Sequence, residues 1–273
     1  MEGIDMDHLS SSQITLYQQC GLKYKYQYID LLPKPFRSSA LAFGSVVHSA
    51  LQYFHDERMK GKTVSLDLLY RIFDADWYTQ KLSANIRFKE GEQEIVLIHL
   101  GKEFLGMYFK ESPKSIKGSE IPFTVPLYNP DTGEDLGVTL QGFLDLVEKD
   151  DTIVEYKTSA QTLSAQDLDT RHQFTAYAYA YEILHHNPPK AIKIVNFVKG
   201  KKPKMVVSET KRSRSDYKGF LFVAMQVLNG IKAEQFMPRM GFWCKECEYA
   251  NICPLFTKFG TRSAEKKPQE VTA

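Results

Sequence analysis

The chain has 273 residues, 43% of them hydrophobic and 25% charged, which excludes collagen-like and disordered classes and allows one large domain or two modest ones. A formal net charge of +2 is too small for a uniformly basic nucleic-acid coat, so any such contact would come from a local patch. The longest apolar run, 220–228, is too short to cross a bilayer, and the acidic N-terminus lacks a signal-peptide core. These features predict a soluble cytoplasmic protein with no membrane contact.

Helical patterns fill the first 115 residues. Hydroxyls at 10–12 offer an N-cap to a helix that ends near Cys20, and apolar periodicity predicts further helices at 40–59, 66–81 and 92–110. Leu41, Val47, Leu51 and Phe54 form the expected apolar stripe of the helix at 40–59. His48 lies on that helix, where a lone histidine is more often a packed or surface residue than a metal ligand.

Lysines alternate with tyrosines over residues 23–28. That pattern suits nucleic-acid binding, with rings for stacking and ammonium groups for phosphate. It equally suits an amphipathic segment whose tyrosines pack inward, and apolar alternation usually reports burial. The second interpretation is therefore preferred.

Strand patterns begin after Pro113. Residues 120–128 and 136–147 alternate, with a turn at 129–133 between them. Glu120 opens the first of these strands, where it is either a further carboxylate for a site or, as preferred here, an edge-strand charge. A helix over 167–186, strands at 191–198 and 205–208, and a helix over 215–232 follow. The strongest positive cluster of the chain lies in this part: Lys199, Lys201, Lys202, Lys204, Lys211, Arg212, Arg214 and Lys218.

The stretch 142–157 predicts a β-hairpin that carries charged residues. Asp145 ends one apolar run, a polar turn follows, and the second strand holds Glu155 and Lys157 on one face, with Tyr156 on the other. Two carboxylates and an ammonium are costly to desolvate unless they bind a metal or one another. The alternative is an ordinary solvated hairpin face.

Three of the four cysteines follow the pattern C-x₂-C-x₅-C near the C-terminus. A soft metal centre needs a fourth thiol, and Cys20 is the one that remains beside Cys244, Cys247 and Cys253. Four cysteines serve both Zn²⁺ and iron–sulfur clusters. Zinc ribbons usually show two paired CxxC knuckles, so this spacing favours iron–sulfur and predicts a clasp between the two ends of the fold.

In their order along the chain, these features resemble the RecB-like branch of the PD-(D/E)XK nucleases. The likeness is greatest to iron–sulfur members such as the AddB nuclease domain and the CRISPR-associated RecB-like exonucleases. The motifs are the helix ending in Cys20, Gly44 to His48, Glu120, Gly142-Phe143-Leu144-Asp145, Glu155-Tyr156-Lys157, Gln173 to Tyr177 and the cysteine trio. Leu144 stands where the family's PD motif has proline, a departure that this branch tolerates.

The resemblance implies an α/β (α+β) fold with a restriction-endonuclease-like core, in which helices flank a central mixed sheet. It assigns 1–260 to one nuclease domain, with a helical N-terminal insertion at about 36–115 and a catalytic sheet core at about 116–210. The iron–sulfur clasp would comprise the ends 10–22 and 241–256, and 261–273 would form a polar tail.

The resemblance also implies roles for individual residues. His48, Asp145, Glu155 and the Tyr156 carbonyl would hold Mg²⁺ or Mn²⁺, and Lys157 would position the attacking water. Gln173 and Tyr177 match the QxxxY element beside the DNA. Cys20, Cys244, Cys247 and Cys253 would hold a [4Fe–4S] cluster, with Zn²⁺ as the alternative.

The implied activity is metal-dependent deoxyribonuclease action on single-stranded DNA. A backbone bridge over the site would thread the strand, so that cleavage starts from an end, in the 5′→3′ direction that is commoner among iron–sulfur members. DNA repair, recombination and CRISPR adaptation are the implied settings. The chain has no GxxxxGK[ST] loop, so a partner helicase or CRISPR or recombination protein is plausible. The alternatives are a non-catalytic nucleic-acid clamp and a zinc-stabilised endonuclease.

Overall fold

The computed structural model describes residue 4 and residues 6–256. The polar tail expected at 261–273 lies outside these residues. The first part of the chain is mainly helical, as predicted. Its elements are β1 (His8–Leu9), α1 (Ser11–Gln19), α2 (Gly21–Tyr24), a π-helical segment (Lys25–Ile29), β2 (Arg37–Ser38), α3 (Ser39–Met59), α4 (Leu66–Ser83), β3 (Ile86–Arg87) and α5 (Glu94–Glu111).

The remaining elements build the sheet and its second layer of helices. They are β4 (Ile116–Tyr128), β5 (Asp135–Glu148), β6 (Thr152–Ser159), α6 (Ala165–Thr170), α7 (His172–His185), β7 (Ala191–Val198), β8 (Lys204–Thr210) and α8 (Arg214–Lys232). Two short 3₁₀ segments follow, Phe242–Glu246 and Ala250–Ile252; Cys244 lies in the first, and Cys247 and Cys253 directly follow the first and the second.

The main sheet has six strands, and its mixed topology confirms the predicted restriction-endonuclease-like architecture. The order is β1-β5-β6-β7-β8, and β4 pairs with β5. The meander β4–β5–β6 is antiparallel, whereas β6 and β7 are parallel and are joined through α6 and α7. A parallel pair requires a crossover connection, which is helical here, because the chain must return to the end of the sheet at which the first strand began.

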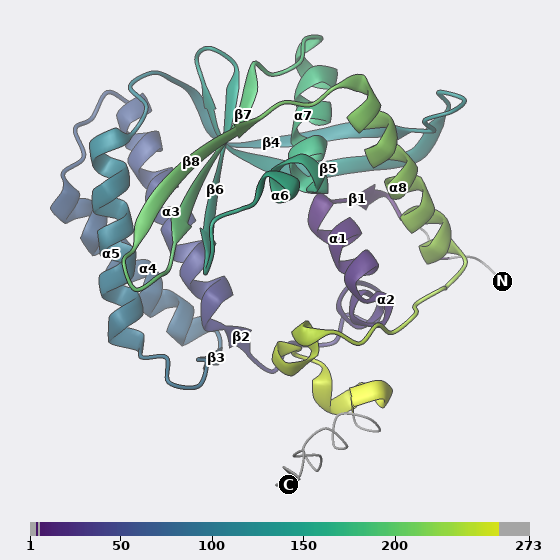
Figure 1. Ribbon diagram of the computed structural model, residues 1–273, viewed down its shortest axis with the longest axis horizontal. Coiled ribbons are helices and arrows are strands. Elements are labelled where there is room, and N and C mark those ends of the chain that lie inside the picture. Colours follow the sequence, from purple (N-terminus) through teal and green to yellow (C-terminus); the bar gives the residue numbers. More distant parts are fainter. Residues whose placement is uncertain (1–3, 5, 257–273) are drawn as a thin grey trace, which may run out of the picture.

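Helices cover both faces of the sheet (Figure 1), and each face has its own hydrophobic cluster. One cluster joins α1, α7 and α8 to the sheet, around Ile14, Phe174 and Phe220. The other joins α3, α4 and α5 to the opposite face, around Phe43, Phe73 and Phe104. Because side chains alternate along β6, Ile153 belongs to the first cluster, and Val154 and Tyr156 to the second, as the hairpin pattern predicts.

Three local expectations need correction. The helix expected over 167–186 is two helices separated at Arg171, and Arg212 bridges the break by donating to the Leu168 carbonyl and to Thr175 Oγ1. Leu41 is 55% exposed, because its turn of α3 lies at the lip of a cavity. The segment 23–28 is helical; only Tyr24 is fully buried, while Tyr26 and Tyr28 are partly covered.

Hydroxyl caps fix several helix starts. Ser10 and Gln13 form a capping box at α1, so the predicted N-cap is confirmed. Ser213 and Asp216 do the same for α8. Within the described residues, no helix combines the length and the hydrophobicity that crossing a bilayer requires.

Candidate functional site

Asp145 and Glu155 lie where β5 and β6 separate. The paired register covers Leu146 with Val154 and Val147 with Ile153, and its continuation would set Asp145 opposite Glu155. Instead of a further strand pair, the Tyr156 N–H donates a 2.8 Å hydrogen bond to Asp145 Oδ2. The Asp145 side chain therefore accepts the hydrogen bond that a backbone carbonyl would accept if the two strands continued to pair. As a result, both carboxylates lie at the same end of the hairpin.

His48 and Glu120 complete a group of three possible metal ligands with Asp145. One ligand atom of each lies within 4.8 Å of the others, and His48 Nδ1 is 3.5 Å from Asp145 Oδ2. Glu120 is partly buried and has a positive φ of 47° in the middle of β4, between residues that pair regularly with β5. Among the described strands β4 pairs with β5 alone, so Glu120 does lie on an edge strand, but its carboxylate converges on the other two, which favours the alternative of a further carboxylate for the site.

The pKa directions in this group reflect burial and shared charge. Burial by itself would lower the pKa of His48, but the hydrogen bond and charge of Asp145, with the charge of Glu155, raise it overall. Burial would raise the pKa of Asp145, and His48 reverses that, so this pKa is lowered. Burial and the charge of Asp145 raise the pKa of Glu120. The carboxylates thus repel one another, and a bound cation would offset this repulsion.

Glu155 is 1% exposed and lies on β6 beside Lys157. Its Oε1 accepts from Lys157 Nζ and, at 2.9 Å, from Gln173 Nε2, whereas its Oε2 has no hydrogen-bond partner among the described residues. Burial and the charge of Asp145 raise the pKa of Glu155 to about 7. A buried carboxylate oxygen without a donor is costly, so this atom also fits a cation-binding site.

Gln173 links the hairpin to α7. Its Oε1 accepts from Lys157 Nζ at 2.7 Å, and its Nε2 donates to Glu155 and, at 2.7 Å, to Tyr177 Oη. The amide orients both charged side chains, and the phenol orients the amide. The i, i+4 spacing of Gln173 and Tyr177 makes this possible because it places both on one helix face.

A buried polar network lies behind the site, and the sequence patterns gave no indication of it. Tyr156 Oη is 2.5 Å from Tyr108 Oη and 3.2 Å from His55 Nε2, which is 2.8 Å from Tyr108 Oη. Burial lowers the pKa of His55 to about 3, so this imidazole stays neutral. The Tyr156 ring also meets the His48 ring edge to face at 5.9 Å between centroids. The network ties β6 to α3 and α5.

A cavity of about 630 Å³ opens onto the site; we call it the α3 cleft. Its lining includes His48, Glu120 and Lys157 at one end, small residues of α3, and Arg37 of β2. The space is therefore continuous with the candidate ligands, and a chain of substrate could lie along α3.

The four cysteines, although far apart in sequence, line one small cavity of about 30 Å³: Cys20, Cys244, Cys247 and Cys253. All four are partly buried, and burial raises the pKa of Cys247. The cavity is closed by apolar side chains that include Trp243 and Phe256. Four sulfur donors around one space fit a soft metal centre.

The cysteine segment packs against the N-terminal helices and touches the helical layer. Lys23 pairs with Glu248 at 2.5 Å, and Tyr249 Oη donates to the Leu32 carbonyl at 3.0 Å. Lys89, which follows β3, pairs with Glu246 at 3.1 Å. The C-terminal segment thus lies beside the connection between the π-helical segment and β2, as Figure 1 shows.

The basic residues of 199–218 do not all act as free phosphate contacts. Lys199 lies over the Phe43 ring at 4.0 Å, and Arg214 pairs with Glu182 at 3.1 Å. Arg212 fills the break between α6 and α7. Three of the eight basic residues of this cluster therefore have partners within the protein.

A sequence profile of the PD-(D/E)XK nuclease superfamily matches residues 8–254, and the chain therefore belongs to this superfamily. Among solved structures, a crystal structure from Eubacterium rectale described as a "Putative exonuclease" aligns with a TM-score of 0.57 at 13% identity. The alignment covers 97% of this chain and 91% of that one. A structure of SSO0001 aligns with a TM-score of 0.39 at 13% identity, over 88% and 94% of the two chains. No curated protein matches the chain significantly.

Membership of this superfamily identifies the protein as a nuclease with a nucleic-acid substrate, and nucleases of this superfamily use divalent metal ions. The group His48, Glu120 and Asp145 is a possible site for such an ion.

Proposed function

We propose that the protein hydrolyses phosphodiester bonds of single-stranded DNA from an end, with Mg²⁺ or Mn²⁺ bound in the α3 cleft. The observation that carries this proposal is the convergence of His48, Glu120 and Asp145 beside the unpartnered Oε2 of buried Glu155. These atoms are hard oxygens and an imidazole, the ligands that such cations take.

His48, Asp145, Glu155 and the Tyr156 carbonyl would hold the metal ion, and Glu120 adds a carboxylate to the same group. When bound, the ion supplies a hydroxide-like nucleophile at neutral pH and offsets charge on the phosphate. The chain itself orients the ligands: the Tyr156 N–H fixes Asp145, and Gln173 fixes Glu155. Burial excludes water from Glu155, which strengthens its attraction for a cation.

Lys157 would position the attacking water and would offset the negative charge that develops at the phosphate. Its ammonium is held between Glu155 and Gln173, and its side chain is 24% exposed and lines the cleft, so the group is already oriented. A preorganised donor costs no reorganisation during the reaction, which is why such groups lower the barrier.

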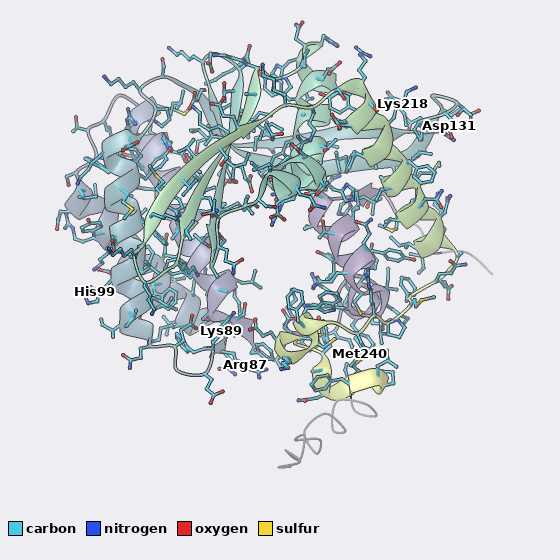
Figure 2. The ribbon with its side chains drawn as sticks, in the orientation of Figure 1. Arg87, Lys89, His99, Asp131, Lys218 and Met240 are labelled. Carbon is cyan, nitrogen blue, oxygen red and sulfur yellow. The ribbon has the colours of Figure 1, made fainter. Side chains whose placement is uncertain are left out.

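Action from an end is supported by the path of the chain around the site. Residues 30–36 connect the π-helical segment to β2, and the Leu32 carbonyl is fastened to Tyr249. The side chains drawn in Figure 2 leave the middle of that view uncovered, between α3, α1 and the segment around Met240. We propose that residues 30–36 form a bridge over the site. A single strand of DNA would be threaded under this bridge and cut in the 5′→3′ direction that the resemblance implies. The structural neighbour described as an exonuclease supports action from an end.

The four thiols would hold a [4Fe–4S] cluster with a structural role, and Zn²⁺ is the alternative. A cluster would lock the C-terminal segment onto Cys20 and so fix the bridge at 30–36, since both are linked through Tyr249. Repair, recombination or CRISPR adaptation, with a partner helicase, are the settings we propose.

The test is to purify the protein anaerobically, measure its iron and sulfide, and incubate it with Mn²⁺ and linear or circular single-stranded DNA. We expect shortening of linear DNA, no cutting of circles, and loss of cleavage in Lys157→Ala. Lys149→Ala, an exposed lysine of the same hairpin, is the matched control and should cleave normally.

Other outcomes would point to other functions. DNA binding with no cleavage by the wild type would favour the non-catalytic clamp. Cutting of circles by colourless, iron-free protein would favour the zinc-stabilised endonuclease. Cleavage that survives Lys157→Ala unchanged would place the chemistry elsewhere.

A further inference from the structure

Arg37 is fixed in place at the mouth of the α3 cleft. Its strand β2 pairs with β3, and its backbone N–H donates to the Asn85 carbonyl at 2.8 Å. Its guanidinium donates to Gln80 Oε1 on α4. Both the backbone and the side chain are therefore held before any ligand arrives, although nothing in the sequence marks this arginine.

The charge of Arg37 is not neutralised by the protein. Among the described residues, no carboxylate lies within 4.0 Å of its guanidinium, and Gln80 is a neutral partner. Two other cations of the helical layer are paired with carboxylates: Arg71 with Asp67 at 3.2 Å and Lys102 with Asp74 at 2.7 Å. A guanidinium has five donors in a planar fork, so several remain for an anion such as phosphate.

The position of Arg37 relative to the candidate metal ligands defines which phosphate it could reach. Arg37 and His48 line the same cavity, and α3 runs from Ser39 past His48 between them. Nine residues of α-helix span about 14 Å at 1.5 Å each. The backbone next to Arg37 therefore lies about 14 Å from His48 along α3, which favours contact of Arg37 with a neighbouring phosphate over contact with the scissile one.

The wall between the two ends of the cleft leaves room for a backbone to pass. On α3 it includes the small residues Ala40, Gly44 and Ser45, with Leu41 at the lip. At Gly44 a Cβ would already come within 3.2 Å of Thr158 Oγ1, so a larger side chain there would narrow the passage.

We propose that Arg37 is a phosphate anchor, which binds the DNA strand at a phosphate one or more nucleotides away from the cleaved bond, with Gln80 as its positioning residue. This inference rests on the proposed function and adds a substrate contact to it. The anchor would hold the strand in register along α3 and would contribute to binding equally before and during cleavage.

The experiment measures binding of a fluorescent single-stranded oligonucleotide by anisotropy over a series of KCl concentrations, in a Lys157→Ala background that prevents cleavage. Each phosphate contact on a single strand contributes about 0.7 to the slope of log K against log salt. We expect Arg37→Gln to reduce the slope by about 0.7 and to weaken binding several-fold. Arg37→Lys should keep the slope but bind more weakly, because it loses the fork. Gln80→Leu should likewise keep the slope and weaken binding.

Arg71→Gln is the matched control, since Arg71 lies in the same helical layer but is paired with Asp67, and it should leave both slope and affinity unchanged. In otherwise wild-type protein, Arg37→Gln should raise KM and leave kcat unchanged, the pattern of a contact made equally in ground and transition states.

The outcomes separate the two proposals. If the wild type cleaves DNA but Arg37→Gln matches Arg71→Gln in slope and affinity, the anchor is overturned and the proposed function stands. If the wild type neither binds nor cleaves DNA, both proposals fail. If Arg37→Gln does not fold, Arg37→Lys decides, because an affinity equal to the wild type would overturn the anchor.

Discussion

The Tyr156 N–H donates to Asp145 Oδ2 at 2.8 Å, across the point where β5 and β6 stop pairing. One hydrogen bond thus orients a candidate metal ligand and places the Tyr156 carbonyl and the side chains of Glu155 and Lys157 relative to it. The Tyr156 phenol is anchored in turn to Tyr108 and His55. The geometry of the site therefore depends on packing between β6, α3 and α5 as well as on the hairpin.

Mn²⁺ should stabilise the folded protein, and Asp145→Asn should remove most of this effect. Asp145 is central to the ligand group, and a ligand at about 100 times its dissociation constant adds about 2.7 kcal/mol to the stability of the state that binds it. Thermal unfolding with and without Mn²⁺ measures the shift. The control is Asp131→Asn, at an exposed turn residue that is labelled in Figure 2. Mn²⁺ should raise its unfolding temperature as much as that of the wild type. An equal Mn²⁺ shift in Asp145→Asn would contradict the metal site.

Gln173→Ala should slow cleavage and weaken metal binding by about 10- to 100-fold, the usual cost of removing a group that orients metal ligands. The amide holds both Lys157 and Glu155, so its loss frees the two side chains to move. Initial cleavage rates as a function of Mn²⁺ concentration test this. Gln226→Ala, on the exposed face of α8, is the control. Normal rates in Gln173→Ala would show that Lys157 is positioned without α7.

His55 should make stability fall in mild acid. Burial lowers its pKa in the folded protein from 6.5 to about 3, so the unfolded chain binds more protons between these values. The contribution of neutral His55 to the free energy of unfolding is fully present above pH 6.5 and is lost progressively as the pH falls towards 3. The loss between pH 6.5 and 5 is about 1 to 2 kcal/mol. Urea unfolding at several pH values measures the slope.

The variant His55→Gln keeps a hydrogen-bonding group near Tyr108 but does not titrate in this range. Its stability should be lower at neutral pH and should depend less on pH than that of the wild type. His99→Gln, at an exposed histidine, should keep the wild-type slope. Identical slopes in His55→Gln and the wild type would mean that His55 does not carry the effect.

Two glycines inside helices should respond to alanine in opposite directions. A Cβ on Gly101 of α5 would overlap the buried Phe73 ring, so Gly101→Ala should destabilise the protein by about 1 to 3 kcal/mol. A Cβ on Gly219 of α8 meets nothing within 4 Å, so Gly219→Ala should stabilise it by about 0.5 to 1 kcal/mol. Chemical denaturation measures the free energy of unfolding of the two variants. Stabilisation by Gly101→Ala as well as by Gly219→Ala would refute the packing of α5 on α4.

Much of the fold could be predicted because its signals are local. Apolar residues that recur every three or four positions in α3, and alternate in β4 and β5, report which side of each element is buried. The same logic placed Glu155 and Lys157 on one face of β6. It failed at Arg171, where a helix break depends on Arg212, which lies 41 positions further along the chain and which no local pattern includes.

The sequence by itself determined the order of helices and strands, the charged hairpin and the four thiols available for a metal centre. Only the tertiary structure decided that Glu120 joins His48 and Asp145, and that Arg37 lies in the same cleft without a carboxylate partner among the described residues. The physical reason is that periodicity specifies which face of an element is buried, whereas the meeting of distant residues depends on how helices pack across the sheet.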